Sequence, residues 1–382
     1  MMNVLLLGAT GSIGESVLNV ISQNKESLNL LGISFNKNVL RYQEILKEHS
    51  PDYVYVDDHD SYKSLCNKDN GRYLNGDEEL ERLINKDDFD IIVCATSGFA
   101  GLKSAYVASK TGKKILLANK ESIVAGGDLI LPLAKENNSE IIPIDSEHNA
   151  IFQCLSGEKG TEDVKKITIT ASGGPFINTS IKELKHVTIE EALNHPNWKM
   201  GSKVTIDSAT LVNKCLELIE AKYLFDLDEK YFDLVIHPQS IIHSIVTYID
   251  GSSICQMSSP DMRVPIAHAL SEGNRIPIDF KDLDFSNLNL SFQEFPSDRS
   301  KIQDIARDVC NKGGFLGTVF NAANEIAVES FLNKKINFNE IYEVIYRTFD
   351  KNIVSNEVTI ESINEVDAQT RIHAQKVVKS FA

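Results

Sequence analysis

The stretch that decides the fold is NVLLLGATGSIGESVLNVI, residues 3–21. An apolar run leads into three glycines, Gly8, Gly11 and Gly14, and then into a segment whose apolar residues have helical spacing. Glycines let a backbone turn approach a pyrophosphate, and the free N–H groups at the start of the following helix attract an anion. The G-x-x-G-x-x-G spacing therefore predicts a dinucleotide-binding turn, with a plain glycine turn as the alternative.

Outward from this stretch, short apolar runs alternate with longer mixed segments as far as about Asp145. Apolar strands separated by helices are typical of a parallel sheet that is covered on both faces. We therefore expect an N-terminal doubly wound, Rossmann-like α/β domain over residues 1–149.

The pattern changes after Ala150. The segments KKITITASGG and DLVIHPQSIIHSIVTYIDGSSICQMSS are predicted as strands, and the pair Asp250-Gly251 as the turn of an antiparallel hairpin. We expect an α+β domain over residues 150–276, with a lid loop near 194–203. A linker is predicted over residues 277–300, which have little periodicity, and helical spacing predicts a C-terminal α-helical bundle over residues 301–382.

Composition narrows the classes of function. The 382 residues carry a net charge of -15, which argues against nucleic acid or an anionic membrane surface as a partner because both require a cationic face. The six cysteines are scattered without C-x-x-C spacing, as expected of buried thiols in a reducing cytoplasm. The N-terminal sequence reads as a first strand rather than a signal or transit peptide, and no apolar run approaches the roughly 20 residues of a membrane span.

The end of the second predicted strand discriminates between cofactors. An NAD site usually places Asp or Glu about 20 residues after the glycine turn. Here LLGISF is followed by Asn36, Lys37 and Asn38. A lysine between two amides suits the 2′-phosphate of NADP(H), although an ordinary solvated loop lysine is the alternative.

Carboxylates in two distant segments are candidates for one metal site. Asp145 and Glu147 lie two residues apart in PIDSEHNA, at the expected end of a strand, so an extended backbone would direct both side chains to the same face. With Glu217 they would offer three hard oxygen ligands, which suit Mg²⁺ or Mn²⁺. The alternative is that Asp-Ser-Glu only caps the helix that follows.

The run TIDSATLVNKCLELIEA, residues 205–221, is predicted as one helix that carries both a phosphate site and a metal ligand. Asn213 and Glu217 are four residues apart and share a helix face, with Lys214 beside them and Ser208 near the predicted start. A surface amphipathic helix is the alternative.

Three further features are candidates for ligand contact. The glycine turn ASGGPF could present Ser172 and neighbouring amides to an anion. His195 is one of several histidines in the neighbouring segments, and packing is the commoner role of a single histidine. Trp198, the only tryptophan, lies in the polar, turn-rich segment NHPNWKMGS, as expected of a lid that closes over a ligand.

Six motifs occur in this order: GATGSIG, LLANKES, PIDSEHNAIFQ, ASGGPF, HPNWKMGSKVTIDSATLVNKCLELIEA and HPQSIIHS. With these motifs the chain resembles the 1-deoxy-D-xylulose 5-phosphate reductoisomerases over essentially its whole length. The resemblance implies a homodimer in which each chain has an NADPH domain, a catalytic domain that binds metal and substrate, a linker and a helical bundle.

The resemblance also implies roles for individual residues. Metal ligands would be Asp145, Glu147 and Glu217. Candidate catalytic residues would be Lys120, Glu147 and His195. Substrate contacts would come from Lys120, Ser146, Glu147, Ser172, His195, Trp198, Ser208, Asn213, Lys214 and Glu217. Cofactor contacts would come from Thr10, Gly11, Ser12, Ile13, Asn36, Lys37, Asn38, Asn119, Glu121 and Gly201.

The expected activity is a rearrangement of 1-deoxy-D-xylulose 5-phosphate, followed by reduction with NADPH to 2-C-methyl-D-erythritol 4-phosphate, a step of isoprenoid precursor synthesis. A short-chain-dehydrogenase-like NADP oxidoreductase is an alternative, because Tyr106 and Lys110 match a Y-x-x-x-K pair. That pair is expected about once by chance, and this alternative leaves the carboxylates unexplained. A non-catalytic NADP-sensing regulator is the second alternative.

Overall fold

The computed structural model of the protein describes residues 1–68, 73–158, 160–271, 274–349 and 357–381. The chain divides into two compact units. Unit 1 consists of Met1–Asn119, Ile130–Asp145 and Met262–Phe280. Unit 2 consists of Lys120–Leu129, Ser146–Asp261 and Lys281–Ala382. Residues 350–356 and 382 of the predicted helical bundle lie outside the described residues.

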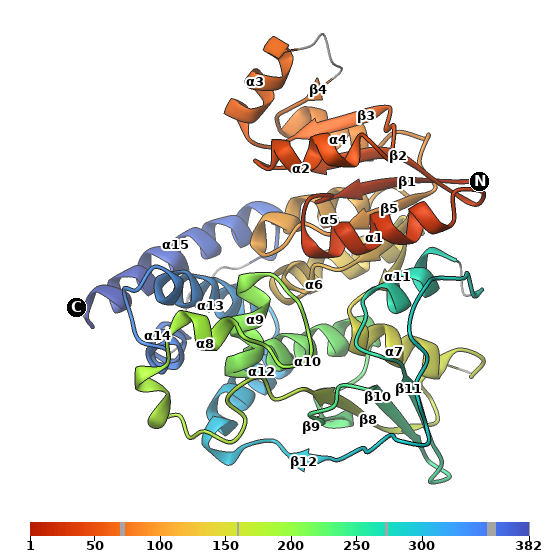
Figure 1. Ribbon diagram of the computed structural model, residues 1–382. Coiled ribbons are helices and arrows are strands. Elements are labelled where there is room, and N and C mark those ends of the chain that lie inside the picture. The colour runs from red at the N-terminus through yellow and green to blue at the C-terminus, as the bar shows by residue number, and fades with distance from the viewer. Residues whose placement is uncertain (69–72, 159, 272–273, 350–356, 382) are drawn as a thin grey trace. The chain divides into compact units, whose positions relative to one another are not determined.

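Unit 1 is built on a sheet of seven parallel strands in the order β4-β3-β2-β1-β5-β6-β7 (Figure 1). The strands are β1 (Met2–Leu7), β2 (Leu28–Phe35), β3 (Tyr53–Val56), β4 (Tyr73–Leu74), β5 (Ile91–Cys94), β6 (Lys114–Leu117) and β7 (Glu140–Pro143). Their side chains are largely buried, as the apolar runs predict. The strand order reverses between β1 and β5, which is where doubly wound sheets bind ligands.

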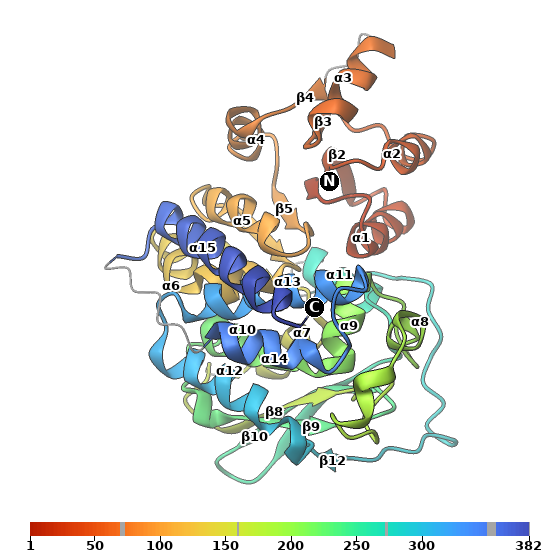
Figure 2. The same ribbon diagram turned by 90° about the vertical axis from the view of Figure 1, so that its left-hand side faces the viewer.

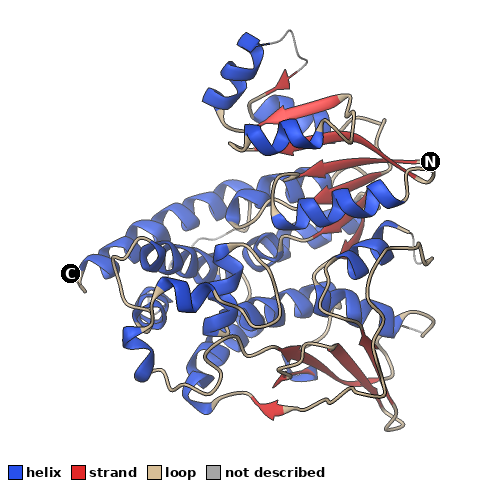
Figure 3. Cartoon of the chain, in the orientation of Figure 1, coloured by secondary structure: helices blue, strands red, loops and turns tan. Residues whose placement is uncertain are grey.

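Helices alternate with these strands along the chain, so the predicted doubly wound α/β fold is confirmed (Figure 3). They are α1 (Ser12–Gln23), α2 (Val39–Ile45), α3 (His59–Lys68), α4 (Asp77–Ile84), η1 (Phe99–Gly101), α5 (Leu102–Ala108), the C-terminal part of α6 (Lys120–Glu136) and α11 (Arg263–Leu270). Helix α3 buries only Leu65 and strand β4 has only two residues, so neither leaves a clear apolar pattern in the sequence.

Unit 2 contains a five-stranded mixed sheet in the order β11-β10-β8-β9-β12. Its strands are β8 (Val164–Ala171), β9 (Phe232–Ile236), β10 (Ile242–Tyr248), β11 (Ser253–Met257) and β12 (Gln293–Glu294). The predicted hairpin is confirmed, because β10 pairs antiparallel with β11 and Gly251 supplies a positive φ of 89° at the turn. Strand β12 lies inside the segment predicted as a linker and pairs with β9.

The helices of unit 2 are α7 (Ser146–Leu155), η2 (Glu183–His186), α8 (Ile189–Leu193), α9 (Ser202–Thr210), α10 (Val212–Leu224), η3 (Glu229–Tyr231), η4 (Ser297–Arg299), α12 (Ser300–Lys312), α13 (Leu316–Leu332), α14 (Glu340–Phe349) and α15 (Ile360–Lys379). The last four are helical as their spacing predicts, and α13, α14 and α15 pack side by side (Figures 1 and 2). None of the described helices combines the length and apolar character that a membrane span requires.

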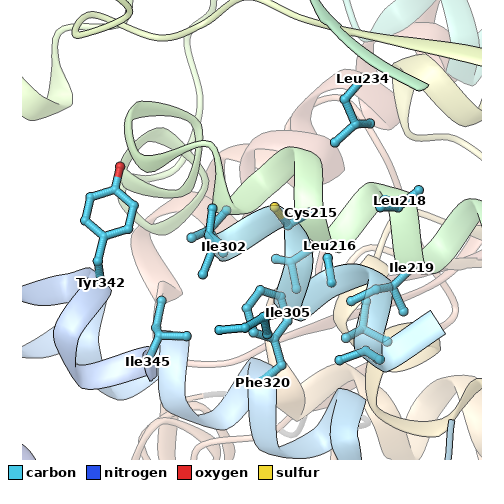
Figure 4. Close-up of a cluster of buried hydrophobic side chains, with 14 of the residues drawn as sticks. Cys215, Leu216, Leu218, Ile219, Leu234, Ile302, Ile305, Phe320, Tyr342 and Ile345 are labelled. Atoms are coloured by element: carbon cyan, nitrogen blue, oxygen red, sulfur yellow. The ribbon is translucent and has the colours of Figure 1, made fainter. Parts of the chain in front are cut away.

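One apolar core joins α10 to the C-terminal helices and the sheet of unit 2. Cys215, Leu218 and Ile219 of α10 belong to one buried cluster with Ile302 of α12 and Phe320 of α13, and all five are fully buried (Figure 4). This packing holds α10 rigidly along one face. The polar residues on the other face of α10 are therefore fixed in position.

Candidate active site

Two glycines of the N-terminal turn are required by close packing. A Cβ on Gly8, whose φ is 91°, would lie 2.8 Å from the backbone of Ala95 and Thr96 beyond β5. A Cβ on Gly14 would lie 2.4 Å from the carbonyl oxygen of Gly8. Gly11 is the N-cap of α1 and offers no side-chain hydrogen bond, so the first N–H groups of the helix are available to an anion. The predicted dinucleotide turn therefore includes Thr10 and Gly11, and Ser12 and Ile13 are the first two residues of α1.

The turn after β2 is exposed, as a cofactor site requires. Asn36, Lys37 and Asn38 follow Phe35, and the Asn38 side chain caps α2. The Lys37 side chain is 76% exposed, and its Nζ lies 3.8 Å from Asp58 Oδ1. Exposed pairs of this kind contribute little stability, so Asp58 competes weakly with any anion that approaches Lys37.

Asn119 is the other predicted cofactor residue in unit 1. Its side chain is buried, and Nδ2 donates to the carbonyl oxygens of Thr96 and Gly98 at 2.6 and 2.8 Å. These bonds fix Asn119 against the loop that follows β5. Strand β5 is next to β1, where the strand order of the sheet reverses. Glu121 and Gly201, which the resemblance also implies as cofactor contacts, belong to unit 2.

The Asp145–Glu147 segment is not extended, so this part of the sequence prediction was wrong. Strand β7 ends at Pro143, and Ser146 and Glu147 form the first turn of α7. The Ser146 hydroxyl donates to Glu147 Oε2 at 2.6 Å, and the Ser244 hydroxyl donates to the Glu147 carbonyl at 2.9 Å. The side chains of Ser146 and Glu147 therefore leave the first turn of a helix and not an extended strand end.

The predicted helix over residues 205–221 is in fact two helices, which is a second correction. Leu211 separates α9 from α10 with a left-handed φ of 62°. Ser208 therefore lies near the end of α9 and not near the start of the helix that carries Glu217. The shared face within α10 is as the spacing predicts, because Asn213 Nδ2 donates to Glu217 Oε1 at 2.5 Å.

Two lysines surround the Glu217 carboxylate. Lys120 Nζ donates to Glu217 Oε1 at 3.0 Å and to Asn213 Oδ1 at 3.1 Å. Lys214 Nζ contacts Glu217 Oε2 and lies 3.0 Å from Glu147 Oε1. Glu217 is 1% exposed, so these ion pairs are buried and hydrogen-bonded. The structure thus brings six predicted residues of unit 2 together: Lys120, Ser146, Glu147, Asn213, Lys214 and Glu217.

The carboxylates of this cluster fit a hard divalent cation. Ligand oxygens of Glu147 and Glu217 lie within 4.8 Å of each other. Asp145, which the chain joins directly to Ser146, completes the group of three carboxylates that could hold a metal ion. A donor set made only of carboxylate oxygens suits Mg²⁺ or Mn²⁺ and not zinc, which favours nitrogen and sulfur ligands.

Ser172, Ser208 and His195 form a second polar cluster. The Ser172 hydroxyl follows the end of β8 and lies 2.9 Å from His195 Nε2 and 3.5 Å from the Ser208 hydroxyl. Gly174 N–H donates to the same Ser172 oxygen at 3.2 Å, in a turn whose two glycines have positive φ. Hydroxyls, a ring N–H and turn amides are the donors that bind a phosphate.

The environment of His195 defines its tautomer. The backbone N–H groups of Asn197 and Trp198 donate to Nδ1 at 3.1 and 3.0 Å, so the ring proton of the neutral form is on Nε2, which faces Ser172. Burial lowers the pKa of His195 to about 4, so the ring is neutral at pH 7. A neutral His195 is a hydrogen-bond donor to the Ser172 region without adding charge.

Side-chain hydrogen bonds of Asn197 hold the predicted lid segment in place. The Asn197 amide donates to the Pro238 carbonyl at 2.5 Å and to the Ser240 hydroxyl at 3.2 Å. The Trp198 ring lies 6.0 Å from the ring of His243, in a tilted arrangement. His195 and Trp198 therefore lie on the same loop, three residues apart.

The sequence interpretation missed several polar residues that hold these clusters. His148 Nε2 lies 2.9 Å from the Glu217 carbonyl and Nδ1 lies 3.3 Å from Glu220 Oε2, and both side chains are fully buried. Lys203 pairs with Glu121 and Asp207. The Lys203–Asp207 spacing of four residues was the one available signal. Of the Y-x-x-x-K pair, Tyr106 lies on α5 and Lys110 lies two residues beyond its end, with the Lys110 ammonium over the Tyr106 ring, 3.8 Å from its centroid.

Models of known protein families match most of the chain. Three family models match: 1-deoxy-D-xylulose 5-phosphate reductoisomerase over residues 4–127, its C-terminal domain over 141–225, and the DXP reductoisomerase C-terminal domain over 257–373.

Similar sequences and structures agree with these matches. The 1-deoxy-D-xylulose 5-phosphate reductoisomerase of Clostridium perfringens (strain 13 / Type A) is 44% identical over 97% of this chain and 98% of its own. That of Vesicomyosocius okutanii is 41% identical over all of both chains. A solved DOX-P reductoisomerase in complex with NADPH, fosmidomycin and magnesium aligns with a TM-score of 0.92, at 38% identity, over 99% of this chain and 98% of its own. The Zymomonas mobilis enzyme in complex with NADPH aligns with a TM-score of 0.91, at 38% identity, over 99% of both chains. The chain belongs to the 1-deoxy-D-xylulose 5-phosphate reductoisomerase family.

Proposed function

We propose that this protein converts 1-deoxy-D-xylulose 5-phosphate into 2-C-methyl-D-erythritol 4-phosphate, with NADPH and Mg²⁺ or Mn²⁺, in isoprenoid precursor synthesis. The observation that carries the proposal is the cluster in which Lys120 and Lys214 meet Glu147 and Glu217. Family membership supports it, as do solved relatives in complex with NADPH and with magnesium.

Asp145, Glu147 and Glu217 would hold the metal ion. When bound, such a cation polarises the ketone and hydroxyl oxygens of the substrate and stabilises the negative charge that develops on them. The residues around it orient the ligands: the Ser146 hydroxyl holds Glu147, and Asn213 holds Glu217. Ligand carboxylates that are already hydrogen-bonded lose little freedom when they bind.

Ser172, Ser208, Asn213 and Lys214 would bind the substrate phosphate. Ser172 and Ser208 lie side by side, and the turn amide of Gly174 already donates to Ser172. Lys214 adds a positive charge, and neutral His195 adds the Nε2 proton. Trp198, on the same loop as His195, would cover the bound substrate and exclude water.

Lys120, Glu147 and His195 are the proposed catalytic residues. Lys120 touches both Glu217 and Asn213, so its ammonium is directed toward the metal ligands and can donate a hydrogen bond to an oxygen that becomes negative as the carbon skeleton rearranges. Glu147, held by Ser146 and Lys214, can accept a proton from a substrate hydroxyl. His195 positions the phosphate end.

NADPH would bind the glycine turn of unit 1. Its pyrophosphate would lie at the start of α1 beside Thr10, Gly11, Ser12 and Ile13, and its 2′-phosphate would meet Asn36, Lys37 and Asn38. Asn119, Glu121 and Gly201 would contact the rest of the cofactor. When bound, NADPH supplies the hydride that reduces the rearranged aldehyde.

We also propose the organisation of the whole chain: an NADPH domain over 1–149, a catalytic domain over 150–276, a linker over 277–300 and a helical bundle over 301–382. A homodimer is supported by β11, an edge strand of its sheet that exposes Ile254. A cytoplasmic location is supported by six cysteines, none of which forms a disulfide.

An assay of NADPH absorbance with 1-deoxy-D-xylulose 5-phosphate tests the function. We expect oxidation of NADPH that stops with a chelator and returns with Mn²⁺, which a cofactor-sensing regulator would not show. Tyr106→Phe should leave the rate unchanged, whereas a short-chain-dehydrogenase-like enzyme would lose it. No NADPH oxidation by metal-loaded protein with this substrate would refute the proposal.

A further inference from the structure

Lys203 lies between two buried carboxylates that belong to different helices of unit 2. It is the second residue of α9, and its Nζ is 2.8 Å from Glu121 Oε1 at the start of α6 and 2.8 Å from Asp207 Oδ2 one turn along α9. Glu121 is 5% exposed and Asp207 is 1% exposed. The Lys203 ammonium is therefore the cation that joins the start of α6 to α9.

The helix dipole does not explain the position of Lys203. A cation in the first turn of a helix faces the positive end of the helix dipole, which is unfavourable. Burial also lowers the pKa of Lys203, yet the carboxylates of Asp207 and Glu121 outweigh it and raise that pKa well above its usual value. Without Lys203, Glu121 and Asp207 would each lose a buried ion pair, which is strongly unfavourable.

The contacts of Lys203 lie next to three groups of the proposed site. Glu121 follows Lys120, whose Nζ reaches Glu217. Gly201 precedes α9 at the end of the lid segment. Asp207 precedes Ser208, but Asp207 has a second anchor, because Asn324 Nδ2 of α13 donates to its Oδ1 at 2.8 Å. Loss of Lys203 would therefore remove the ion pair that ties Glu121 to α9, whereas Asp207 would keep its bond to Asn324.

We infer that Lys203 is a positioning residue for the reaction, which holds Glu121, and through it Lys120, in place against α9. The inference rests on the proposed function. It assigns Lys203 no contact with substrate or with a proton in transfer. Its consequence is specific: the placement of Glu121 and Lys120 depends on Lys203, whereas Ser172 keeps its contacts with His195 and Ser208.

The test uses the full-length protein with its substrate, NADPH and Mn²⁺. Lys203→Met removes the charge at similar length, Lys203→Arg retains it, and Glu121→Gln removes the partner. Arg307→Met is the matched control, because it breaks a half-buried ion pair with Glu229 whose described contacts involve none of the proposed site residues. Thermal unfolding, kcat, KM for NADPH and competitive inhibition by inorganic phosphate are measured for each.

We expect Lys203→Met to lower kcat about 100-fold, the usual effect of a displacement near 1 Å at a reacting group, and to raise KM for NADPH. Inhibition by inorganic phosphate should be unchanged. Lys203→Arg should recover most of kcat. Glu121→Gln should reproduce the fall in kcat, and the double variant should fall no further, because both changes break the same contact. Arg307→Met should lose stability and keep wild-type kinetics.

Several results would overturn the inference. Wild-type kinetics in Lys203→Met or in Glu121→Gln would do so, as would additive losses in the double variant, or a parallel loss of phosphate inhibition. If Lys203→Met does not fold, Lys203→Arg and Glu121→Gln still decide the question. Absence of activity in the wild-type protein would instead count against the proposed function, so the two failures are distinguishable.

Discussion

Replacing Glu217 with glutamine separates the metal role of this residue from its structural role. The side chain is 1% exposed and accepts from Lys120, Asn213 and Lys214, so Glu217→Gln keeps its size and removes a buried negative charge. Removing one partner of a buried ion pair costs about 3–5 kcal/mol. Lys214 retains Glu147 at 3.0 Å, so we expect the lower limit, about 3 kcal/mol. At about 2–4 °C per kcal/mol, Tm without metal should fall by about 6–12 °C.

The response to Mn²⁺ is the sharper measurement. At a Mn²⁺ concentration of about 100 times its Kd, the wild-type protein should gain about 2.7 kcal/mol of stability, or roughly 5–11 °C in Tm. Loss of even a supporting residue of a metal site weakens binding about 10- to 100-fold. With 100-fold weaker binding, Glu217→Gln would gain only about 0.4 kcal/mol at the same concentration, about 1 °C.

Thermal unfolding with and without Mn²⁺ measures both effects, and the assay of NADPH oxidation measures activity. Glu229→Gln is the matched control, because it removes the carboxylate of the Arg307 pair elsewhere in unit 2. It should lose stability and keep the full Mn²⁺ response. If Mn²⁺ raises the Tm of Glu217→Gln as much as that of the wild-type protein, or if turnover at limiting Mn²⁺ is unchanged, Glu217 is not a ligand.

Lys37→Ala should raise KM for NADPH about 10- to 150-fold, which is the value of one charge-assisted hydrogen bond, and should leave KM for NADH nearly unchanged. Steady-state kinetics measures both constants. Equal effects on both cofactors would show that Lys37 does not bind the 2′-phosphate. Between pH 6.5 and about 4 the unfolded chain binds a proton at His195 that the folded chain does not. The free energy of unfolding should therefore decrease as the pH is lowered from 6.5 to about 4. Denaturant titration of His195→Gln should show a shallower fall, and equal slopes would refute the assignment. A phosphonate with a hydroxamate, of the fosmidomycin type, should change the fluorescence of Trp198 only when Mn²⁺ is present, and a metal-independent response would contradict a lid over a shared site.

Much of the fold could be predicted because its signals are local. The turn from Gly8 to Gly14 follows an apolar strand and opens a helix, and both end glycines are required by backbone contacts under 3 Å. The hairpin at Gly251 has a turn sequence that needs a positive φ. Such features depend on a few adjacent residues, so the sequence carries them directly.

The site was harder to predict where a residue acts through distant partners. Asn213 and Glu217 could be placed together because i and i+4 share a helix face. Lys120 lies 97 residues from Glu217 in sequence, and only the family resemblance suggested that they meet. His148 and Lys203 also contact carboxylates through tertiary structure, and a buried lysine looks like a solvated one in sequence.

The break at Leu211 shows why a correct helical signal gave the wrong local structure. The run SATLVNK has neither Gly nor Pro, so nothing local ends the helix, and a left-handed leucine costs about 1–3 kcal/mol. Leu211 is 2% exposed against Ala171 and Ile236, and burial of a leucine stabilises by a similar amount. Tertiary packing therefore overrides the helical preference. In an unbroken helix, Ser208 and Asn213 would lie ~7.5 Å apart along the axis and ~140° apart around it, facing different directions. The break removes that restriction, so the last turn of one helix and the first turn of the next can contribute to a single substrate site.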